Sequence, residues 1–327
     1  MKGSQMYGKI IVFATTASQP LGVAICEKLS IPLGQARVRT FSDGEIDIQL
    51  EENVRDADVF IISETSPPAD KVFEACFLSR AARSSSARRI TMIIPYLGYD
   101  RQDRKDRPRT QISAEFMAQV LKLGYPDRFL FLDVHSEPTL GYFNPLVFDH
   151  LYGSIDAVDY LKKKLADVPP NEIVVASPDK GGGPRAEAYA KRLGLTDYVL
   201  FTKSRPEPNQ VAEASVKIIG DVKDKNIIFV DDIIDTANTI VADAKAAHQE
   251  GAKDIYVFAT HGLFSDQALE RLEASQIKEV IVTDTISHEP YRLATKRIKI
   301  TVLSIAPLLA TAIRRLNQGE GLSSLIK

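Results

Sequence analysis

Acidic and hydroxyl residues at 231–239 have the types and spacing of a site for a phosphorylated sugar. The segment reads Asp-Asp-Ile-Ile-Asp-Thr-Ala-Asn-Thr and follows an apolar run, 227–230, that predicts a strand buried on both faces. A helix-like stretch, 240–249, comes next. A strand, a turn and a helix in this order present free backbone N–H groups and a helix N-terminus to an anion. The hydroxyls of Thr236 and Thr239 add further donors.

Asp231 and Asp232 are expected to stand just beyond the end of this strand, at Val230. Adjacent residues there point in opposite directions, so one could face the hydroxyls of a sugar while the other braces the loop. Asp235 would then lie near the phosphate-binding turn. The alternative is purely structural, because paired aspartates can end a strand and an aspartate with a threonine can cap a helix.

A glycine-rich turn follows a second expected strand. Residues 177–185 read Ser-Pro-Asp-Lys-Gly-Gly-Gly-Pro-Arg. Successive glycines let the backbone approach a ligand closely, and a helix begins at once. Lys180 and Arg185 add positive charge. Such a turn is by itself weak support for a ligand site.

Two pairs of polar residues are each separated by a single residue in the sequence. Asp133 and His135 follow the apolar run 129–132. On an extended chain both side chains point to one side, so they could hold Mg²⁺ near a triphosphate, directly or through water. By the same spacing Lys203 and Arg205, in a proline-rich loop, could stabilise charge on a phosphoryl group in transfer. The alternatives are a structural histidine and an exposed linker with solvated charges.

Two further segments carry charge around turns. Residues 99–109 form the densest charge cluster, and the acids interleaved among its cations argue against a nucleic acid patch. Phe41, Asp43 and Glu45 offer an aromatic face and two carboxylates around a glycine. On composition alone this second segment is an ordinary exposed turn.

The composition is that of an average soluble globular protein. The chain has 327 residues, 44% of them hydrophobic and 26% charged, and its net charge is −2. The length suggests two domains, and the charge gives no case for nucleic acid or membrane binding. Cys26 and Cys76 lie in apolar helical patterns and are expected to be buried thiols without a disulfide. Without a signal-peptide pattern or a long apolar run, the expected location is the cytoplasm.

The elements that must position these residues repeat along the chain. The strand, loop and helix start at 11–22 have a counterpart at 174–185, and residues 40–45 align with 202–207. Strands that alternate with helices predict an α/β fold with mainly parallel sheets covered on both faces.

The two copies differ where a ligand would bind. Where the second copy has its three aspartates, the first has Ser63, Glu64 and Thr65, followed by Pro67 and Pro68. Two prolines remove N–H donors from the loop. The sugar-phosphate site is therefore predicted in the second copy.

The run 231–239 resembles the phosphoribosyl-diphosphate (PRPP) motif of type I phosphoribosyltransferases and of ribose-phosphate pyrophosphokinases (PRPP synthetases). The turn 177–185 resembles the diphosphate loop of the latter family. Segments 41–45, 98–106 and 133–135 are similar to its nucleotide-binding blocks, which a phosphoribosyltransferase does not need. The resemblance implies two duplicated type I phosphoribosyltransferase-like domains.

The resemblance also implies a role for each residue. It implies Mg²⁺ as cofactor, with ATP and ribose 5-phosphate as substrates and PRPP and AMP as products. The implied residues are Phe41, Asp43, Glu45, Arg101, Gln102, Asp103 and His135 for ATP; Asp231, Asp232, Asp235, Thr236, Ala237, Asn238 and Thr239 for ribose 5-phosphate; Asp179, Lys180, Gly181 and Gly182 for the diphosphate; His135, Asp179 and Asp133 for the metal; and Lys203 and Arg205 for catalysis.

The expected organisation follows from the same family. It comprises an ATP-binding domain at 1–153, a ribose-5-phosphate-binding domain at 154–305, and a helix and tail at 306–327 that pack on the first domain. The resemblance implies a homo-oligomer, either a dimer of the family type or a hexamer, because a neighbouring subunit contributes to the adenine site. Two alternatives remain open: a phosphoribosyltransferase that consumes PRPP, and a catalytically weak regulatory paralogue. The family usually has glycine at Asn238, and asparagine is the next best residue for a left-handed backbone.

Overall fold

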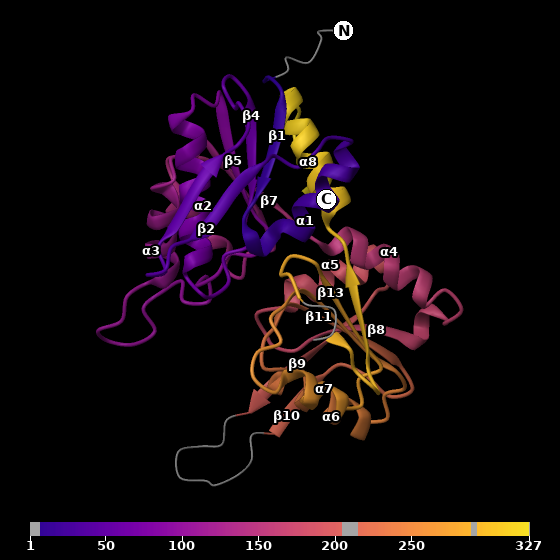
Figure 1. Ribbon diagram of the computed structural model, residues 1–327. Helices are drawn as coiled ribbons and strands as arrows, with labels where there is room; N and C mark the ends of the chain where they lie inside the picture. Colours follow the sequence, from indigo (N-terminus) through magenta and orange to yellow (C-terminus); the bar gives the residue numbers. More distant parts are fainter. Residues whose placement is uncertain (1–6, 205–214, 289–292, 327) are drawn as a thin grey trace. The chain divides into compact units, whose positions relative to one another are not determined.

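The computed structural model describes residues 7–204, 215–288 and 293–326 and consists of two compact units (Figure 1). The first unit comprises Met1–Tyr152, Thr285–Ser287 and Ser304–Lys327, and the second comprises Gly153–Asp284 and His288–Leu303. In the described ranges, no helix combines the length and the apolar character needed to cross a membrane.

The first unit is built on a five-stranded parallel sheet with the order β1-β4-β5-β6-β7. Its strands are β1 (Ile10–Ala14), β4 (Asp58–Ile62), β5 (Arg89–Ile94), β6 (Arg128–Leu132) and β7 (Val147–Leu151), and a separate hairpin pairs β2 (Ala36–Thr40) with β3 (Ile46–Leu50). Its helices are α1 (Gln19–Leu29), α2 (Asp70–Ser84), α3 (Ser113–Lys122), α8 (Ala306–Gln318) and α9 (Ser323–Ile326), with short 3₁₀ turns η1 (Thr16–Ser18) and η2 (Glu137–Phe143).

Helices cover both faces of this sheet, because its central strands are apolar on both sides. One cluster joins α1 and α8 to residues such as Val12 and Phe60. Helices α2 and α3 pack on the other face, against residues such as Met92 and Phe129. Helix α8 therefore belongs to the first unit, where it packs beside α1, the helix that follows β1 and the turn η1.

The second unit contains a seven-stranded sheet with the order β10-β9-β8-β11-β12-β13-β14, in which only β10 runs antiparallel to its neighbour. Its strands are β8 (Ile173–Ser177), β9 (Tyr198–Ser204), β10 (Ser215–Ile219), β11 (Asn226–Ile234), β12 (Ile255–Gly262), β13 (Glu279–Thr283) and β14 (Lys299–Leu303). Its helices are α4 (Ser154–Lys164), α5 (Gly183–Leu193), α6 (Asn238–Gln249) and α7 (Ala268–Glu273), with the 3₁₀ turn η3 (Pro170–Glu172).

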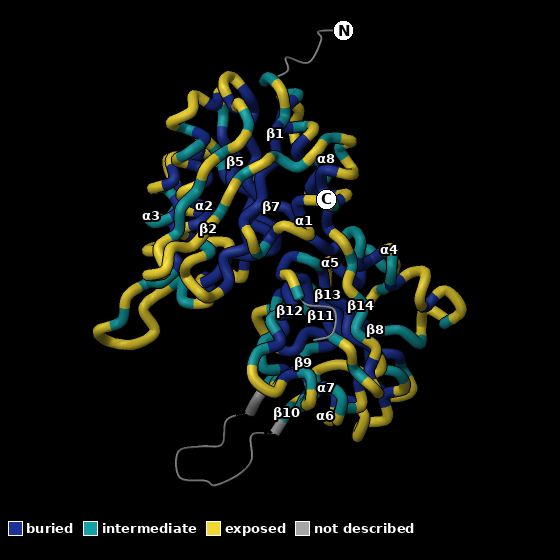
Figure 2. The backbone as a smooth tube through the Cα atoms, in the orientation of Figure 1, coloured by how far each residue is buried: buried dark blue, intermediate teal, exposed yellow. Residues whose placement is uncertain are grey.

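The two units share one strand order. β8-β11-β12-β13-β14 repeats β1-β4-β5-β6-β7 with the same parallel pairing. In both units a helix follows the first two of these strands: α1 and α2 in the first unit, α5 and α6 in the second. Figure 2 shows the central strands of both sheets, such as β4, β5, β11 and β12, among the most buried parts of the chain. The prediction of an α/β fold with parallel sheets flanked by helices is confirmed.

Candidate active site

The acidic residues at 231 and 232 lie inside a strand. β11 extends to Ile234, and Asp231 pairs in register with Ala259 of β12. The prediction that the strand ends at Val230 is therefore wrong. The cause is the long parallel partner strand β12. Its pairing with β11 continues beyond the apolar run and keeps residues up to Ile234 in the sheet.

Both carboxylates are held by one guanidinium. Arg185, in the first turn of α5, places Nη1 3.2 Å from Oδ1 of Asp231 and 2.9 Å from Oδ1 of Asp232. The backbone N–H of Asp232 also donates to Oδ1 of Asp231 at 2.9 Å. The two side chains thus reach one cation, although adjacent strand residues were expected to diverge. Burial and the neighbouring carboxylate of Asp232 raise the pKa of Asp231 well above its ordinary value, while Arg185 opposes that rise.

The turn after β11 leads directly into α6. Ala237 has a left-handed backbone with φ 62° and precedes Asn238, the first residue of the helix. The residue with the left-handed backbone is therefore Ala237 and not Asn238. Asn238 has a helical position, so this turn does not require glycine at residue 238. The side chain of Asn238 donates to Oγ1 of Thr236 at 3.2 Å, and Arg271 donates to the carbonyl oxygen of Thr236 at 2.8 Å. Asp235 and Thr239 flank this turn at the helix N-terminus, where an anion is favoured.

The glycine turn lies between β8 and α5 in the same unit. Asp179 accepts a hydrogen bond from the N–H of Gly182 at 2.7 Å, and Ser177 donates to the carbonyl oxygen of Asp179 at 2.8 Å. A Cβ on Gly182 would lie 2.4 Å from Oγ of Ser177, so only glycine fits there. Lys180 and Gly181 are exposed at the tip of the turn. Asp179 thus shapes its own loop through one carboxylate oxygen.

Of the expected catalytic pair, the structure describes the backbone of Lys203. Lys203 is part of β9 and pairs in register with Val216 of β10. Arg205 lies outside the described residues.

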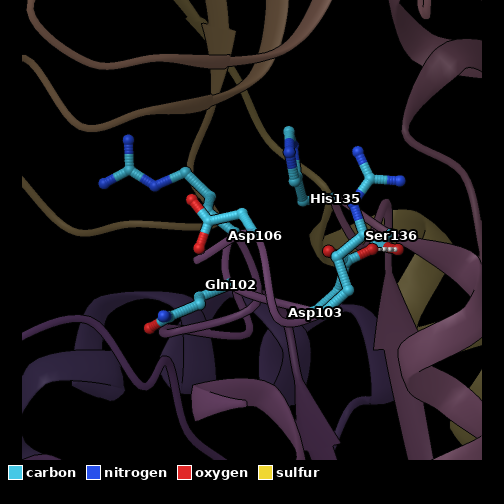
Figure 3. Close-up of a pocket in the computed structure, with 7 residues that line it drawn as sticks. Gln102, Asp103, Asp106, His135 and Ser136 are labelled. Carbon is cyan, nitrogen blue, oxygen red and sulfur yellow. Dashed lines mark hydrogen bonds between the residues drawn. The ribbon is translucent and has the colours of Figure 1, made fainter. Parts of the chain in front are cut away.

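A cavity of about 340 Å³ opens in the first unit (Figure 3). It is lined by Arg101, Gln102, Asp103, Arg104, Asp106, His135 and Ser136. The loop after β5 and the loop after β6 supply these residues, because parallel neighbours end at the same edge of a sheet. Four of the residues expected to hold ATP, at 101, 102, 103 and 135, are therefore brought together.

Hydrogen bonds fix the wall of this cavity. Ser136 donates to Oδ2 of Asp103 at 2.6 Å, the bond drawn as a dashed line in Figure 3. Ser113, at the start of α3, donates to Oε1 of Gln102 at 2.6 Å. Sequence reasoning missed Ser136, whose only signal is its position immediately after His135. Arg104 and Asp106 were included only in the general charge cluster.

The argument that placed Asp133 and His135 on one side of an extended chain is wrong. β6 ends at Leu132, and Asp133 has a left-handed backbone with φ 41°. Among the described residues, no three histidine, cysteine or acidic side chains gather as a protein metal site. Behind the loop, His150 accepts the N–H of Val134 at 3.1 Å, and burial lowers its pKa, although the charge of Asp133 opposes this.

The turn at Phe41 lies elsewhere in the first unit. It closes the β2–β3 hairpin, where Asp43 accepts the N–H of Glu45 at 3.1 Å. The Phe41 ring is 46% exposed, with the guanidinium of Arg39 5.1 Å from its centroid. None of the three residues expected to hold adenine lines the cavity described above.

Comparison with known proteins identifies the family. Residues 10–123 match the N-terminal domain of ribose phosphate pyrophosphokinase, and residues 201–327 match a phosphoribosyl synthetase-associated domain. The chain is 41% identical to a ribose-phosphate pyrophosphokinase of Porphyromonas gingivalis over 96% of both chains. The chain belongs to the ribose-phosphate pyrophosphokinase family. It is also 44% identical to the Haemophilus influenzae enzyme of that name, over 97% of this chain and 98% of the relative.

A solved structure has the same fold as this ribose-phosphate pyrophosphokinase family member. The phosphoribosylpyrophosphate synthetase from Mycobacterium smegmatis matches with a TM-score of 0.87 and 34% identity, covering 95% of this chain and 99% of that one. The expectation drawn from the sequence motifs is thus confirmed for the family.

The turn in the first unit that corresponds to the PRPP motif of this family is filled by its own side chains. After β4, Glu64 is buried, pairs with Lys71 and accepts the N–H of Ser66 at 2.9 Å. In the turn after β1, Thr16 donates both its N–H, at 2.6 Å, and its hydroxyl, at 2.9 Å, to Glu74. Internal carboxylates therefore accept hydrogen bonds from both of these turns of the first unit.

Proposed function

We propose that this chain transfers the β,γ-diphosphoryl group of Mg·ATP to the C1 hydroxyl of ribose 5-phosphate and releases PRPP and AMP. Full-length relatives at 41–44% identity carry the name ribose-phosphate pyrophosphokinase. The observation that carries the proposal is that one chain combines two features suited to phosphate groups. One is the cavity lined by Arg101 and Arg104, and the other is the turn that joins β11 to the N-terminus of α6. A phosphoribosyltransferase that consumes PRPP would need only the second.

The cavity of the first unit fits a nucleotide. Arg101 and Arg104 supply positive charge for a polyphosphate, and Gln102 and His135 offer hydrogen-bonding groups. Asp103, whose carboxylate is held by Ser136, shapes the wall. We assign ATP to this cavity and assign Phe41, Asp43 and Glu45 to the adenine of a nucleotide held on a second subunit.

The second unit fits ribose 5-phosphate. Thr236, Thr239 and the first N–H groups of α6 form a cradle for the 5-phosphate. Asp231 and Asp232 accept hydrogen bonds from the ribose hydroxyls, and Asp235 borders the phosphate. The turn from Asp179 to Gly182 is assigned to the diphosphate.

The reaction joins the ribose C1 oxygen to the β-phosphorus while the bond from that phosphorus to the oxygen of the α-phosphate breaks. AMP departs with that oxygen, and the hydroxyl proton leaves the ribose. Positioning and charge neutralisation supply most of the rate for such transfers. Lys203 and Arg205 are assigned to the charge that develops on the transferred group.

Magnesium is the proposed cofactor. Mg²⁺ usually keeps several waters and binds through substrate phosphates and one or two protein groups, so it does not require a cluster of protein ligands. Asp133, His135 and Asp179 are oxygen or nitrogen donors beside the proposed nucleotide and diphosphate sites and fit that limited role. When bound, the ion would neutralise charge on the phosphate oxygens.

A homo-oligomer is proposed from an exposed apolar surface on α2 and α3. Large apolar side chains project there into solvent. They are Phe73, Phe77, Phe116, Leu123 and Tyr125. An assembly of identical chains through this surface would remove these side chains from solvent.

The cytoplasm is the proposed location. Cys26 and Cys76 are both buried free thiols, as expected from the sequence, and free thiols fit a reducing compartment.

The test is an assay of AMP and PRPP formation from ATP and ribose 5-phosphate with Mg²⁺. Equal amounts of both products that depend on both substrates support the proposal. A protein that forms neither product, or that instead consumes PRPP with a free base, contradicts it.

A further inference from the structure

The first turn of α5 carries a cation, Arg185, that contacts two acids of the neighbouring strand β11. Arg185 follows the glycine turn in sequence, so its charge was expected to serve the diphosphate. In the structure its Nη1 lies 2.9 Å from Asp232 and 3.2 Å from Asp231. Its side chain is largely buried, as is that of Asp232. The guanidinium therefore joins the two strand carboxylates to the helix that covers them.

Two adjacent carboxylates on a buried strand repel each other and lose hydration, so they need a cation to stay ionised. The charged neighbours of Asp231 are Asp232 on its own strand and Arg185 on α5. Its register partner on β12 is Ala259, which brings no charge. A planar guanidinium can serve two carboxylates with fixed geometry, which a lysine ammonium does not reproduce.

We propose that Arg185 is a positioning residue that holds Asp231 and Asp232 in the orientation and charge state required to receive the ribose hydroxyls. This inference rests on the proposed function of the β11 turn. It makes ribose 5-phosphate, and not ATP, the substrate whose binding depends on Arg185.

The alternative role for Arg185 is direct contact with the diphosphate of ATP. The two roles predict different kinetics. A positioning residue changes the apparent affinity for ribose 5-phosphate and moves the acid limb of its pH profile. A diphosphate ligand changes the KM for ATP or the kcat at every pH.

The experiment compares the full-length wild type with Arg185→Gln, Arg185→Lys and the control Lys191→Gln. Lys191 lies on the same helix, is exposed and pairs with Glu187, so the control removes a cation from α5 without touching the acids. kcat and both KM values are measured between pH 6.5 and pH 9.5 under saturating Mg²⁺.

For Arg185→Gln we expect the KM for ribose 5-phosphate to rise about tenfold at pH 7, because the two carboxylates lose the cation that orients them and favours their charged form. The difference in this KM between the variant and wild type narrows as the pH rises, because a higher pH also favours the charged form. The KM for ATP stays within about twofold, and Lys191→Gln behaves as wild type. Arg185→Lys raises the KM for ribose 5-phosphate but leaves the acid limb where it is.

A double-mutant cycle covers the case in which Arg185→Gln folds poorly. In an Asp231→Asn background, Arg185→Gln should cost less than it does alone, because one of the repelling charges is gone. Additive losses, a pH-independent loss or a raised KM for ATP would each overturn the inference. An inactive wild type would instead reject the proposed function, so the two failures are distinguishable.

Discussion

Glu279 provides a quantitative test of the forces that hold the second sheet. It begins β13 with a side chain only 1% exposed, yet it is ionised. Lys164 from α4 lies 2.8 Å away and Lys299 from β14 lies 2.9 Å away. Tyr160 and Thr301 each donate a hydrogen bond of 2.5 Å. The carboxylate thus ties a helix and a strand to β13.

The magnitude follows from the pKa. Burial on its own would raise the pKa of Glu279, but the hydrogen bonds from Lys164, Thr301, Tyr160 and Lys299 outweigh it and lower the pKa from 4.5 to about 2. That difference corresponds to roughly 3 kcal/mol of unfolding free energy at neutral pH. Because Lys164 and Lys299 are 30% and 58% exposed, solvent screening reduces the figure to about 2 kcal/mol.

We therefore expect Glu279→Gln to lower the unfolding free energy of the second unit by about 2 kcal/mol at pH 7. The folded pKa is depressed, so the stabilisation is complete above pH 4.5 and is lost as the pH falls towards 2. The difference in unfolding free energy between wild type and Glu279→Gln should thus be smaller at pH 4 than at pH 7 by roughly 0.5–1 kcal/mol.

Amide hydrogen exchange measures the loss of stability of the second unit separately, because peptides from β13 and β14 can be compared with peptides from β5 in the first unit. A loss of 2 kcal/mol accelerates exchange in β13 and β14 by about 30-fold and leaves β5 unchanged. The matched control is Asp254→Asn, which removes an exposed carboxylate paired with Lys278 and should cost under about 1 kcal/mol. An equal loss for the two variants, or a gap that does not change with pH, would refute the reasoning.

Substitutions at three further positions probe the proposed sites in steady-state kinetics. Ser136→Ala removes the hydrogen bond that holds Asp103, so we expect the KM for ATP to rise about fivefold with the KM for ribose 5-phosphate unchanged; a change in both would contradict a role confined to the cavity. Ala237→Val places a β-branched residue at φ 62° and should raise the KM for ribose 5-phosphate at least about tenfold, whereas Ala237→Gly should keep it within about twofold; similar values for both would reject a left-handed requirement. Lys203→Ala should lower kcat more than tenfold, by about 10²-fold, with little change in either KM, and an equal loss of substrate affinity would show that Lys203 acts before the transition state.

Local patterns predicted the elements well and the ends of the strands less well. The helix expected at 240–249 is α6, which starts only two residues earlier, at Asn238. The apolar run at 227–230 identified β11 but not its length, because pairing with β12 carries it on to Ile234. Such an extension depends on a partner strand distant in sequence and has no local signal.

The candidate sites show the same limit. The sequence identified Arg101 and His135 separately, and the shared edge of β5 and β6 places both around one cavity. The partner of Asp231 could not be found in this way, since Arg185 was assigned by its neighbours in sequence and its guanidinium contacts another strand. The left-handed backbone was expected at Asn238 and lies at Ala237, one residue earlier. The reason is that α6 already begins at Asn238, so the residue before it makes the turn.

The buried Glu64–Lys71 pair in the first unit bears on how many pentose phosphates one polypeptide would hold. A loop whose negative charge is supplied by its own side chain keeps its conformation with no ligand present. If the proposed function holds, we expect one molecule of ribose 5-phosphate to bind to each polypeptide, at the turn after β11.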